Sequence, residues 1–225
     1  MDVQEIAPGL WRWTGFHGEW KQDVGCVYLE APDAICLIDP LVPPEDSERF
    51  FRALDRDVAR AGLPVHVVVT VFWHTRNAGE LAARYDADVW APSRARQAVE
   101  RRAGRARAFR HGDALPAGVE AFATARSNEV VFYLPAHRTL VAGDVILGGP
   151  SLNGEPSLCP DSWLPGDVGR EELRKSLQPL LDLDVDRLLV SHGEPVLENG
   201  GRALAELWPD GTAANGRPAR PESST

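Results

Sequence analysis

Short hydrophobic runs rich in β-branched and aromatic residues recur along this chain, and amphipathic segments separate many of them. Runs of this kind, bounded by Gly, Pro, Asn or Asp, are typical of β-strands. The apolar run over 65–70 is short enough to be a buried strand rather than a helix. The strands predicted in this way are 9–14, 24–30, 34–39, 65–70, 88–91, three stretches within 119–146, and 187–191.

Apolar residues spaced three and four positions apart predict helices between these strands. Asn77 is a plausible N-cap for one helix and Ser93 for an Arg-rich one, and Pro179 is expected to kink a third or to begin a new turn. The segment 147–169 is rich in Gly, Pro and Ser, which predicts a long surface loop. Besides the Arg-rich helix, helices are predicted over 45–60, 77–85, 170–183 and 201–208.

The order of elements indicates two similar halves, each with strands followed by helices. Two sheets packed together with helices outside is one architecture that fits this order. Residues 1–208 are long enough for a single domain with its own hydrophobic core. Residues 209–225 contain almost nothing to bury, so we expect a disordered C-terminal tail.

Charge and composition limit the partners. The formal net charge of −9 argues against a nucleic-acid or anionic-membrane surface. The Arg-rich stretch 94–110 is interpreted as a solvated helix and loop. No apolar run approaches the ~20 residues of a membrane span, and the first residues resemble no export signal. Cys26, Cys36 and Cys159 are odd in number and widely spaced, which predicts reduced thiols in a cytoplasmic protein.

Four stretches, in order, resemble the metallo-β-lactamase superfamily. AICLIDP at 34–40 is similar to the family's strand that ends in Asp, and VVFYLPAHRTLVAGD at 130–144 to the hairpin that ends in Gly-Asp. LLVSHGEPV at 188–196 is similar to the strand before the last metal-binding His. VVVTVFWHTRNAGEL at 67–81 lies where the family places its main metal-binding turn. The resemblance covers about residues 5–208 and implies a four-layer αββα sandwich.

The same resemblance implies that most metal ligands are missing. After the Thr of that turn the family has His-x-His-x-Asp-His, followed later by another His about nineteen residues before the Gly-Asp aspartate. Asp144, the family's bridging carboxylate, and His192, its terminal ligand, remain. The other ligand positions hold Val71, Trp73, Thr75, Arg76 and Ala125, none of which is a metal ligand at neutral pH.

We therefore expect a degenerate member of this fold, a pseudoenzyme that binds a small molecule or a partner without zinc or any other cofactor. Trp73 is bulky and is expected to fill space that a metal and its water need. Arg76 is expected to pair with Asp144 at hydrogen-bond distance, in place of the metal. That pair is interpreted either as a structural salt bridge or as a site for a small anionic molecule.

His74 provides an alternative. It lies one place beyond the second ligand position, so a slipped turn would bring it beside Asp144 and His192. Such a His-Asp-His group is chemically suited to one divalent metal ion with open positions. The protein would then be a hydrolase of a small ester, lactone or thioester. A His74 that hydrogen-bonds within its own turn is the other possibility.

Overall fold

The N-terminal half forms a seven-stranded sheet in which the strands follow one another in chain order. The computed structural model describes residues 2–208, so the predicted disordered tail, 209–225, lies outside the described residues. The first four strands are antiparallel, and the remaining three continue the sheet in parallel. The strands are β1 (Asp2–Ala7), β2 (Leu10–His17), β3 (Gln22–Glu30), β4 (Ile35–Ile38), β5 (Val65–Val68), β6 (Asp88–Pro92) and β7 (Arg107–Phe109).

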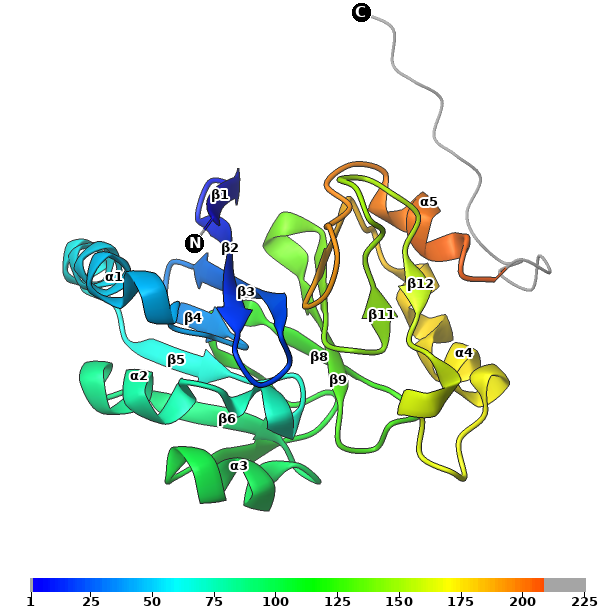
Figure 1. The fold of residues 1–225 in the computed structure, drawn as a ribbon, viewed down its shortest axis with the longest axis horizontal. Coiled ribbons are helices and arrows are strands. Elements are labelled where there is room, and N and C mark those ends of the chain that lie inside the picture. The colour runs from blue at the N-terminus through cyan, green and yellow to red at the C-terminus, as the bar shows by residue number, and fades with distance from the viewer. Residues whose placement is uncertain (1, 209–225) are drawn as a thin grey trace, which may run out of the picture.

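Three helices cover the outer face of this sheet (Figure 1). They are α1 (Ser47–Ala61), α2 (Ala78–Tyr85) and α3 (Arg96–Ala103). α1 is amphipathic and buries Phe50 and Leu54 on the side that faces the sheet. It ends at Gly62, whose φ of 63° is the left-handed conformation that terminates many helices.

The second sheet has four strands in the order β13-β10-β9-β8. Its β10 and β13 are parallel, while β8, β9 and β10 are antiparallel. Two helices pack on its outer face, and a two-stranded hairpin lies beyond β10 (Figure 1). These elements are β8 (Glu120–Ala123), β9 (Val130–Leu134), β10 (Thr139–Ala142), β11 (Ile146–Leu147), β12 (Ser157–Leu158), α4 (Arg170–Leu177), β13 (Arg187–Val190) and α5 (Gly200–Ala205).

Three separate apolar layers show how these parts stack. One layer lies between α1–α3 and the first sheet, and another between the second sheet and α4 and α5. The third lies between the two sheets, where Ile38 and Val68 of the first sheet meet Phe132 and Leu189 of the second. Helix, sheet, sheet and helix therefore form four layers, which confirms the αββα sandwich expected from the sequence.

Several local predictions differ from the structure. Ser93 does not cap α3: the residue before that helix is Ala95, and the Ser93 hydroxyl donates to the carbonyl of Phe109 instead. The strands β1 and β7 were not predicted, nor was β12, which lies in the segment 147–169 that was predicted as a loop. β1 pairs only with β2 at the sheet edge and exposes most of its side chains, so it lacks the alternation that marks a strand. Pro179 begins a 3₁₀ turn over Gln178–Asp182, as the sequence predicted.

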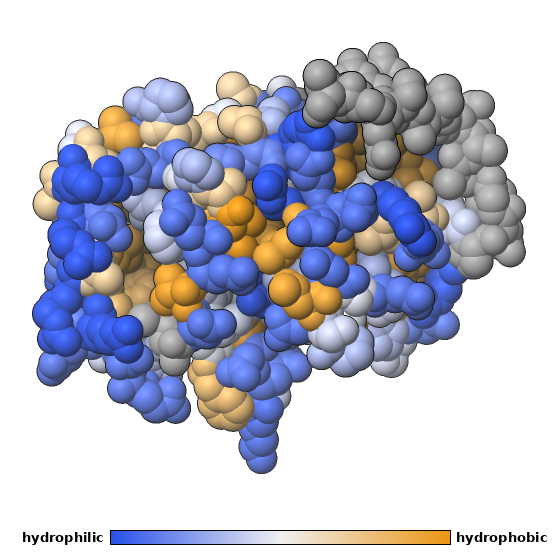
Figure 2. Space-filling view, turned by 90° about the horizontal axis from the view of Figure 1, so that it is seen from above, coloured by the Kyte–Doolittle hydropathy of each residue, from blue (hydrophilic) through white to orange (hydrophobic). Residues whose placement is uncertain are grey.

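The surface seen from above is mostly hydrophilic, with hydrophobic residues gathered in small clusters near its middle (Figure 2). Large hydrophobic side chains that are exposed in the described part of the chain are Val3, Phe16, Leu152 and Trp163. None of the described helices is both long enough and apolar enough to cross a bilayer.

Candidate metal centre

Four polar side chains meet where parallel strands of the two sheets end. Asp39 follows β4, and His74 lies in the short 3₁₀ turn Phe72–Thr75 after β5. Asp144 follows β10, and His192 follows β13. The carboxyl ends of parallel strands collect at one edge of a sheet, where side chains from separate segments converge. Here the edges of both sheets lie together.

Backbone hydrogen bonds connect the two sheets at this edge. The amide of Gly25 in β3 donates to the carbonyl of Ser191 over 2.8 Å, and the amide of Val130 donates to the carbonyl of Thr70 over 3.0 Å. A Cβ atom at Gly25 would lie 2.4 Å from the Val190 carbonyl oxygen, so a side chain there would separate the sheets. The relative position of the two halves of the site is thus set by main-chain contacts.

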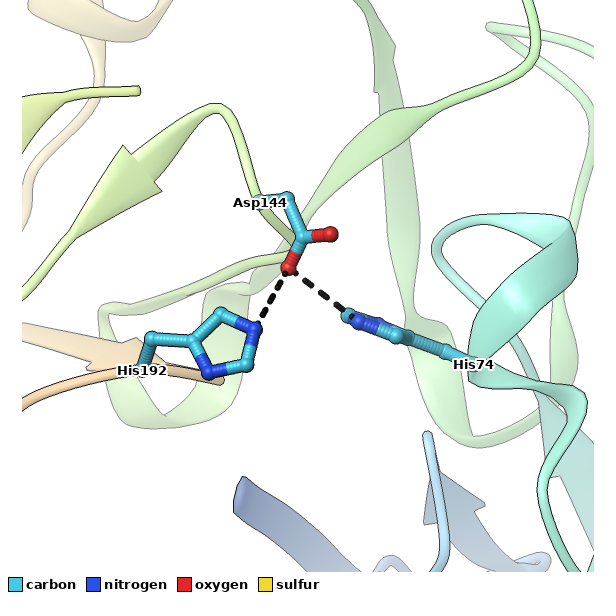
Figure 3. A group of neighbouring side chains, drawn as sticks. All are labelled: His74, Asp144 and His192. Atoms are coloured by element: carbon cyan, nitrogen blue, oxygen red, sulfur yellow. Dashed lines mark ion pairs between the residues drawn. The ribbon is translucent and has the colours of Figure 1, made fainter. Parts of the chain in front are cut away.

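His74, Asp144 and His192 form a compact, buried cluster (Figure 3). Nε2 of His74 is 3.1 Å from Oδ1 of Asp144, and Nε2 of His192 is 3.2 Å from the same oxygen. The two imidazole rings come from different sheets and approach one carboxylate oxygen. The structure therefore brings together the three residues that the slipped turn would require.

A second carboxylate orients His74. Nδ1 of His74 is 2.8 Å from Oδ2 of Asp39, which also accepts from the Thr70 hydroxyl, while Oδ1 of Asp39 accepts from the Thr70 amide. A neutral imidazole carries one N–H group, and this contact assigns it to Nδ1. Nε2 then directs a lone pair toward Asp144. Both Nε2 of His74 and Oδ1 of Asp144 are buried and make no hydrogen bond, although they are close together.

The electrostatics of the cluster favour a cation. Burial and the nearby Arg76 would lower the pKa of His74, but the carboxylates of Asp144 and Asp39 outweigh both and raise it. For Asp144, burial opposes ionisation, yet the neighbouring imidazoles of His74 and His192 hold its pKa well below the usual range. An ionised Asp144 beside two imidazoles can be balanced by a proton on His74 or by a metal ion.

The donor set fits a divalent metal. All three ligand atoms lie within 4.8 Å of one another, and no other such group occurs among the residues that the structure describes. Bonds of ~2.0–2.1 Å to a tetrahedral zinc ion separate neighbouring ligand atoms by about 3.3 Å. The two nitrogen–oxygen distances, 3.1 and 3.2 Å, are close to that spacing. Nε2 of His74 makes no hydrogen bond of standard geometry, so its lone pair is free to bind a metal ion.

Comparison with known proteins finds matches only at the level of structure. No family model and no curated protein matches the sequence. Solved structures do match over nearly the whole chain. A metallo-β-lactamase from Pontibacter korlensis is 16% identical, with a TM-score of 0.65 over 93% of this chain and 99% of that one. This chain has the metallo-β-lactamase fold.

Two further structures with this fold give the same result. A metallo-β-lactamase from Erythrobacter litoralis is 16% identical, with a TM-score of 0.64 over 91% of this chain and 92% of that one. One from Hirschia baltica is 15% identical, with a TM-score of 0.61 over 92% of this chain and 95% of that one. At such identities the likeness establishes the metallo-β-lactamase fold, and activity has to be argued from the site.

Arg76 does not pair with Asp144, so that prediction is wrong. Nη1 of Arg76 donates to the carbonyl of Asp39 over 2.7 Å and makes longer contacts with Gly25 and Cys26. The backbone of Arg76 has a φ of 36° and a ψ of −114°, which directs the side chain toward the first sheet. Asp144, which belongs to the second sheet, obtains its positive neighbours from the two imidazoles instead.

Trp73 contacts Asp144 directly. Its Nε1 donates to Oδ2 of Asp144 over 2.5 Å, the oxygen that the two imidazoles leave free. Among the remaining ligand positions of the metallo-β-lactamase fold, Val71 is buried, Thr75 donates to the carbonyl of Phe72, and Ala125 packs near α4. None of these three side chains makes a hydrogen bond or an ion pair with the side chains of His74, Asp144 or His192.

Glu129 and Arg126 are buried, and the sequence did not single them out. Glu129 holds the main chain of Asp144, and Arg126 contacts both Glu129 and Trp73. Oε1 of Glu129 accepts from the backbone amides of Asp144 and Val145. Its Oε2 is 2.8 Å from Nη1 of Arg126, and the guanidinium of Arg126 lies over the Trp73 ring at 4.8 Å. Burial raises the pKa of Glu129, opposed by Arg126 and reinforced by Asp144. The sequence signal for Glu129 was its place directly before the apolar strand β9, but that place does not show that the Glu129 side chain is buried.

Two tryptophan side chains lie near the imidazoles of the cluster. The Trp20 ring lies 6.0 Å from the His74 ring and 6.2 Å from the His192 ring, measured between centroids. The partly exposed Trp163 lies 6.1 Å from His192. The His17 ring stacks on the Trp20 ring, with a centroid separation of 4.2 Å.

Proposed function

We propose that His74, Asp144 and His192 bind one divalent metal ion, and that the protein is a hydrolase of a small ester, lactone or thioester. The fold supports a hydrolase because the solved structures that share it are named metallo-β-lactamases, which are hydrolases. Three protein ligands leave at least one position open for water or substrate, which is the arrangement of catalytic rather than structural zinc sites.

One observation carries the proposal. His74 has its Nδ1 held by Asp39, while its buried Nε2 lies 3.1 Å from Oδ1 of Asp144 without the geometry of a hydrogen bond. Carboxylates that fix the far nitrogen of a histidine are common behind metal-binding imidazoles, because they set the tautomer and the ring orientation. A histidine that only packed in the core would be expected to satisfy both nitrogens with hydrogen bonds.

Each residue then has a distinct part in the reaction. When bound, the metal would polarise the substrate carbonyl and lower the pKa of a water molecule. His74 and His192 would hold it with Nε2, and Asp144 with Oδ1. Asp39 keeps the Nε2 of His74 available by accepting from Nδ1. Trp20 and Trp163, whose rings lie near the imidazoles, would contact the apolar part of the substrate.

Metal binding can be tested directly on the full chain. Elemental analysis after purification without added zinc should be followed by titration of the chelator-treated protein with Co²⁺, read by visible absorption. We expect one Co²⁺ per chain, and His74→Gln or His192→Gln should weaken its binding at least tenfold, roughly 1.4 kcal/mol or more. Hydrolysis of chromogenic esters, lactones and thioesters should depend on the added metal.

His66→Gln is the matched control. His66 lies in β5, the strand that leads to the site, but it contacts Trp90 rather than the cluster. This variant should bind Co²⁺ like the wild type. Co²⁺ binding that His66→Gln weakens as much as His74→Gln does, or no binding by the wild type, would contradict the proposal.

A metal-free binding protein is the second candidate. Nε and Nη2 of Arg76 are buried and have no hydrogen-bond partner in the structure, so they are donors available to a small anion. The raised pKa of His74 also allows a proton to balance Asp144. Under this candidate, phosphate or acetate should raise the melting temperature in the presence of EDTA, and Arg76→Met should abolish the rise.

A further inference from the structure

Oδ2 of Asp144 is already engaged. The Trp73 indole donates to it over 2.5 Å, whereas both imidazoles approach Oδ1. The indole N–H occupies Oδ2 on the side of Trp73, so Oδ1 is the oxygen that faces the two imidazoles and is placed to bind a metal. The two oxygens of Asp144 therefore have different partners: an N–H group on one side and the metal-binding imidazoles on the other.

The indole is fixed on both of its sides. The guanidinium of Arg126 lies over the ring at 4.8 Å, and the Phe72 ring meets it edge-on at 4.7 Å. Arg126 is buried, and a desolvated cation over a tryptophan face is a favourable contact. Trp73 thus cannot turn away from Asp144 without leaving a buried guanidinium without its aromatic partner.

The same residues also hold the main chain of Asp144. Arg126 pairs with Glu129, and Glu129 accepts from the Asp144 amide. Contacts therefore run in a closed ring from Asp144 to Glu129, Arg126, Trp73 and back to Asp144. A Cβ atom at Gly143 would lie 2.7 Å from Oε1 of Glu129, so the chain before Asp144 has no room for a side chain.

Building on the proposed function, we infer that Trp73 is a positioning residue: its indole N–H holds Oδ2 of Asp144, so that Oδ1 alone is presented to the metal ion. The ion pair of Arg126 with Glu129 lies behind the Trp73 ring and keeps the indole against the carboxylate.

Titration of the full-length protein with Co²⁺, comparing wild type with Trp73→Phe, tests this inference. Phenylalanine keeps an aromatic face for Arg126 but has no N–H group. Outer-shell partners of metal ligands typically change metal affinity by about 10- to 100-fold, and we expect a loss in that range. The freed Oδ2 should also turn to the metal, which lowers the intensity of the visible Co²⁺ bands as the coordination number rises.

Trp73→Gln keeps an N–H donor without the ring, and its Co²⁺ affinity should stay within a few-fold of the wild type. Trp90→Phe is the control: Trp90 also donates its Nε1 to a side chain, His66, but lies on β6 away from the cluster. It should change neither the affinity nor the spectrum. Urea unfolding of each variant separates a loss of metal binding from a loss of fold.

The outcomes are distinct. If wild type and Trp73→Phe bind one Co²⁺ with equal affinity and identical spectra, the inference is overturned and the proposed function stands. If Trp73→Phe does not fold, a Trp73→Gln variant with weakened binding and an altered spectrum also contradicts it. A wild type that binds no Co²⁺ overturns the proposed function and the inference together.

Discussion

Two residues beside the cluster of His74, Asp144 and His192 have unusual backbone conformations. Asp39 has a φ of 49° and Arg76 a φ of 36°, and residues other than glycine seldom adopt positive φ values. The guanidinium of Arg76 donates to the carbonyl of Asp39, so the two positions are directly connected. Asp39 in turn holds His74. Strain of this kind persists where surrounding contacts enforce it, and it concentrates at functional sites.

The strain at Arg76 predicts an inverted order of stability for two variants. Arg76→Ala and Arg76→Gly both lose the guanidinium, but only glycine accepts the positive φ without penalty. We expect Arg76→Gly to be the more stable of the two by about 1–2 kcal/mol in urea unfolding.

The matched pair is Arg84→Ala and Arg84→Gly, since Arg84 lies in α2. There alanine should be the more stable by up to about 1 kcal/mol. The same order at both positions would show that the Arg76 backbone is unstrained.

The residues of the site differ in how far the sequence could reveal them. Asp144 and His192 follow apolar strands in recognisable contexts, so their positions could be predicted. His74 could be offered only as an alternative, because its place depends on how the turn after β5 winds. The hydrogen-bond partner of Arg76 depends on the positive φ of its backbone, which no sequence pattern predicts. Arg126 and Glu129 look like exposed turn charges until the two sheets pack around them.

At the level of elements, the strands and helices with strong patterns were predicted, and the crossing of their loops was not. The loop after β13, which carries His192, crosses the loop after β11 by backbone contact. The Gly148 amide donates to the His192 carbonyl over 2.8 Å, and the Glu194 amide donates to the Gly149 carbonyl over 2.9 Å. A Cβ atom at Gly148 would lie 2.0 Å from the Glu194 carbonyl oxygen. Sequence patterns show the two glycine-rich loops but not that they touch.

This crossing predicts a defined effect of one methyl group. Gly148→Ala should push the two loops apart, cost about 1–3 kcal/mol as overpacking usually does, and displace His192 from the cluster. Melting temperature and Co²⁺ affinity should therefore fall together. Gly166→Ala is the control, because a Cβ atom there would meet nothing within 4 Å. Gly148→Ala with wild-type stability and metal affinity would show that the crossing does not position His192.

At the scale of the whole molecule, the cluster joins the two sheets. His74 extends from the end of β5 in the first sheet, whereas Asp144 and His192 follow β10 and β13 in the second. The apolar layer between the sheets also holds them together, with Phe132 and Leu189 among its members. A metal ion bound by all three ligands would add a polar connection across that layer at its open edge.

Metal should therefore stabilise the whole fold rather than one loop. A ligand that binds only the folded state, at a free concentration 100 times its dissociation constant, adds about 2.7 kcal/mol, which for this chain length is roughly 5–10 °C in melting temperature. We expect a rise of that size when Zn²⁺ is added to the chelator-treated protein, and its reversal by EDTA.

His74→Gln should lose most of the rise although Asp144 and His192 remain, because the remaining ligands belong to one sheet. His66→Gln should keep it. A Zn²⁺-induced rise that persists in full in His74→Gln would mean that the ion binds elsewhere and does not connect the sheets.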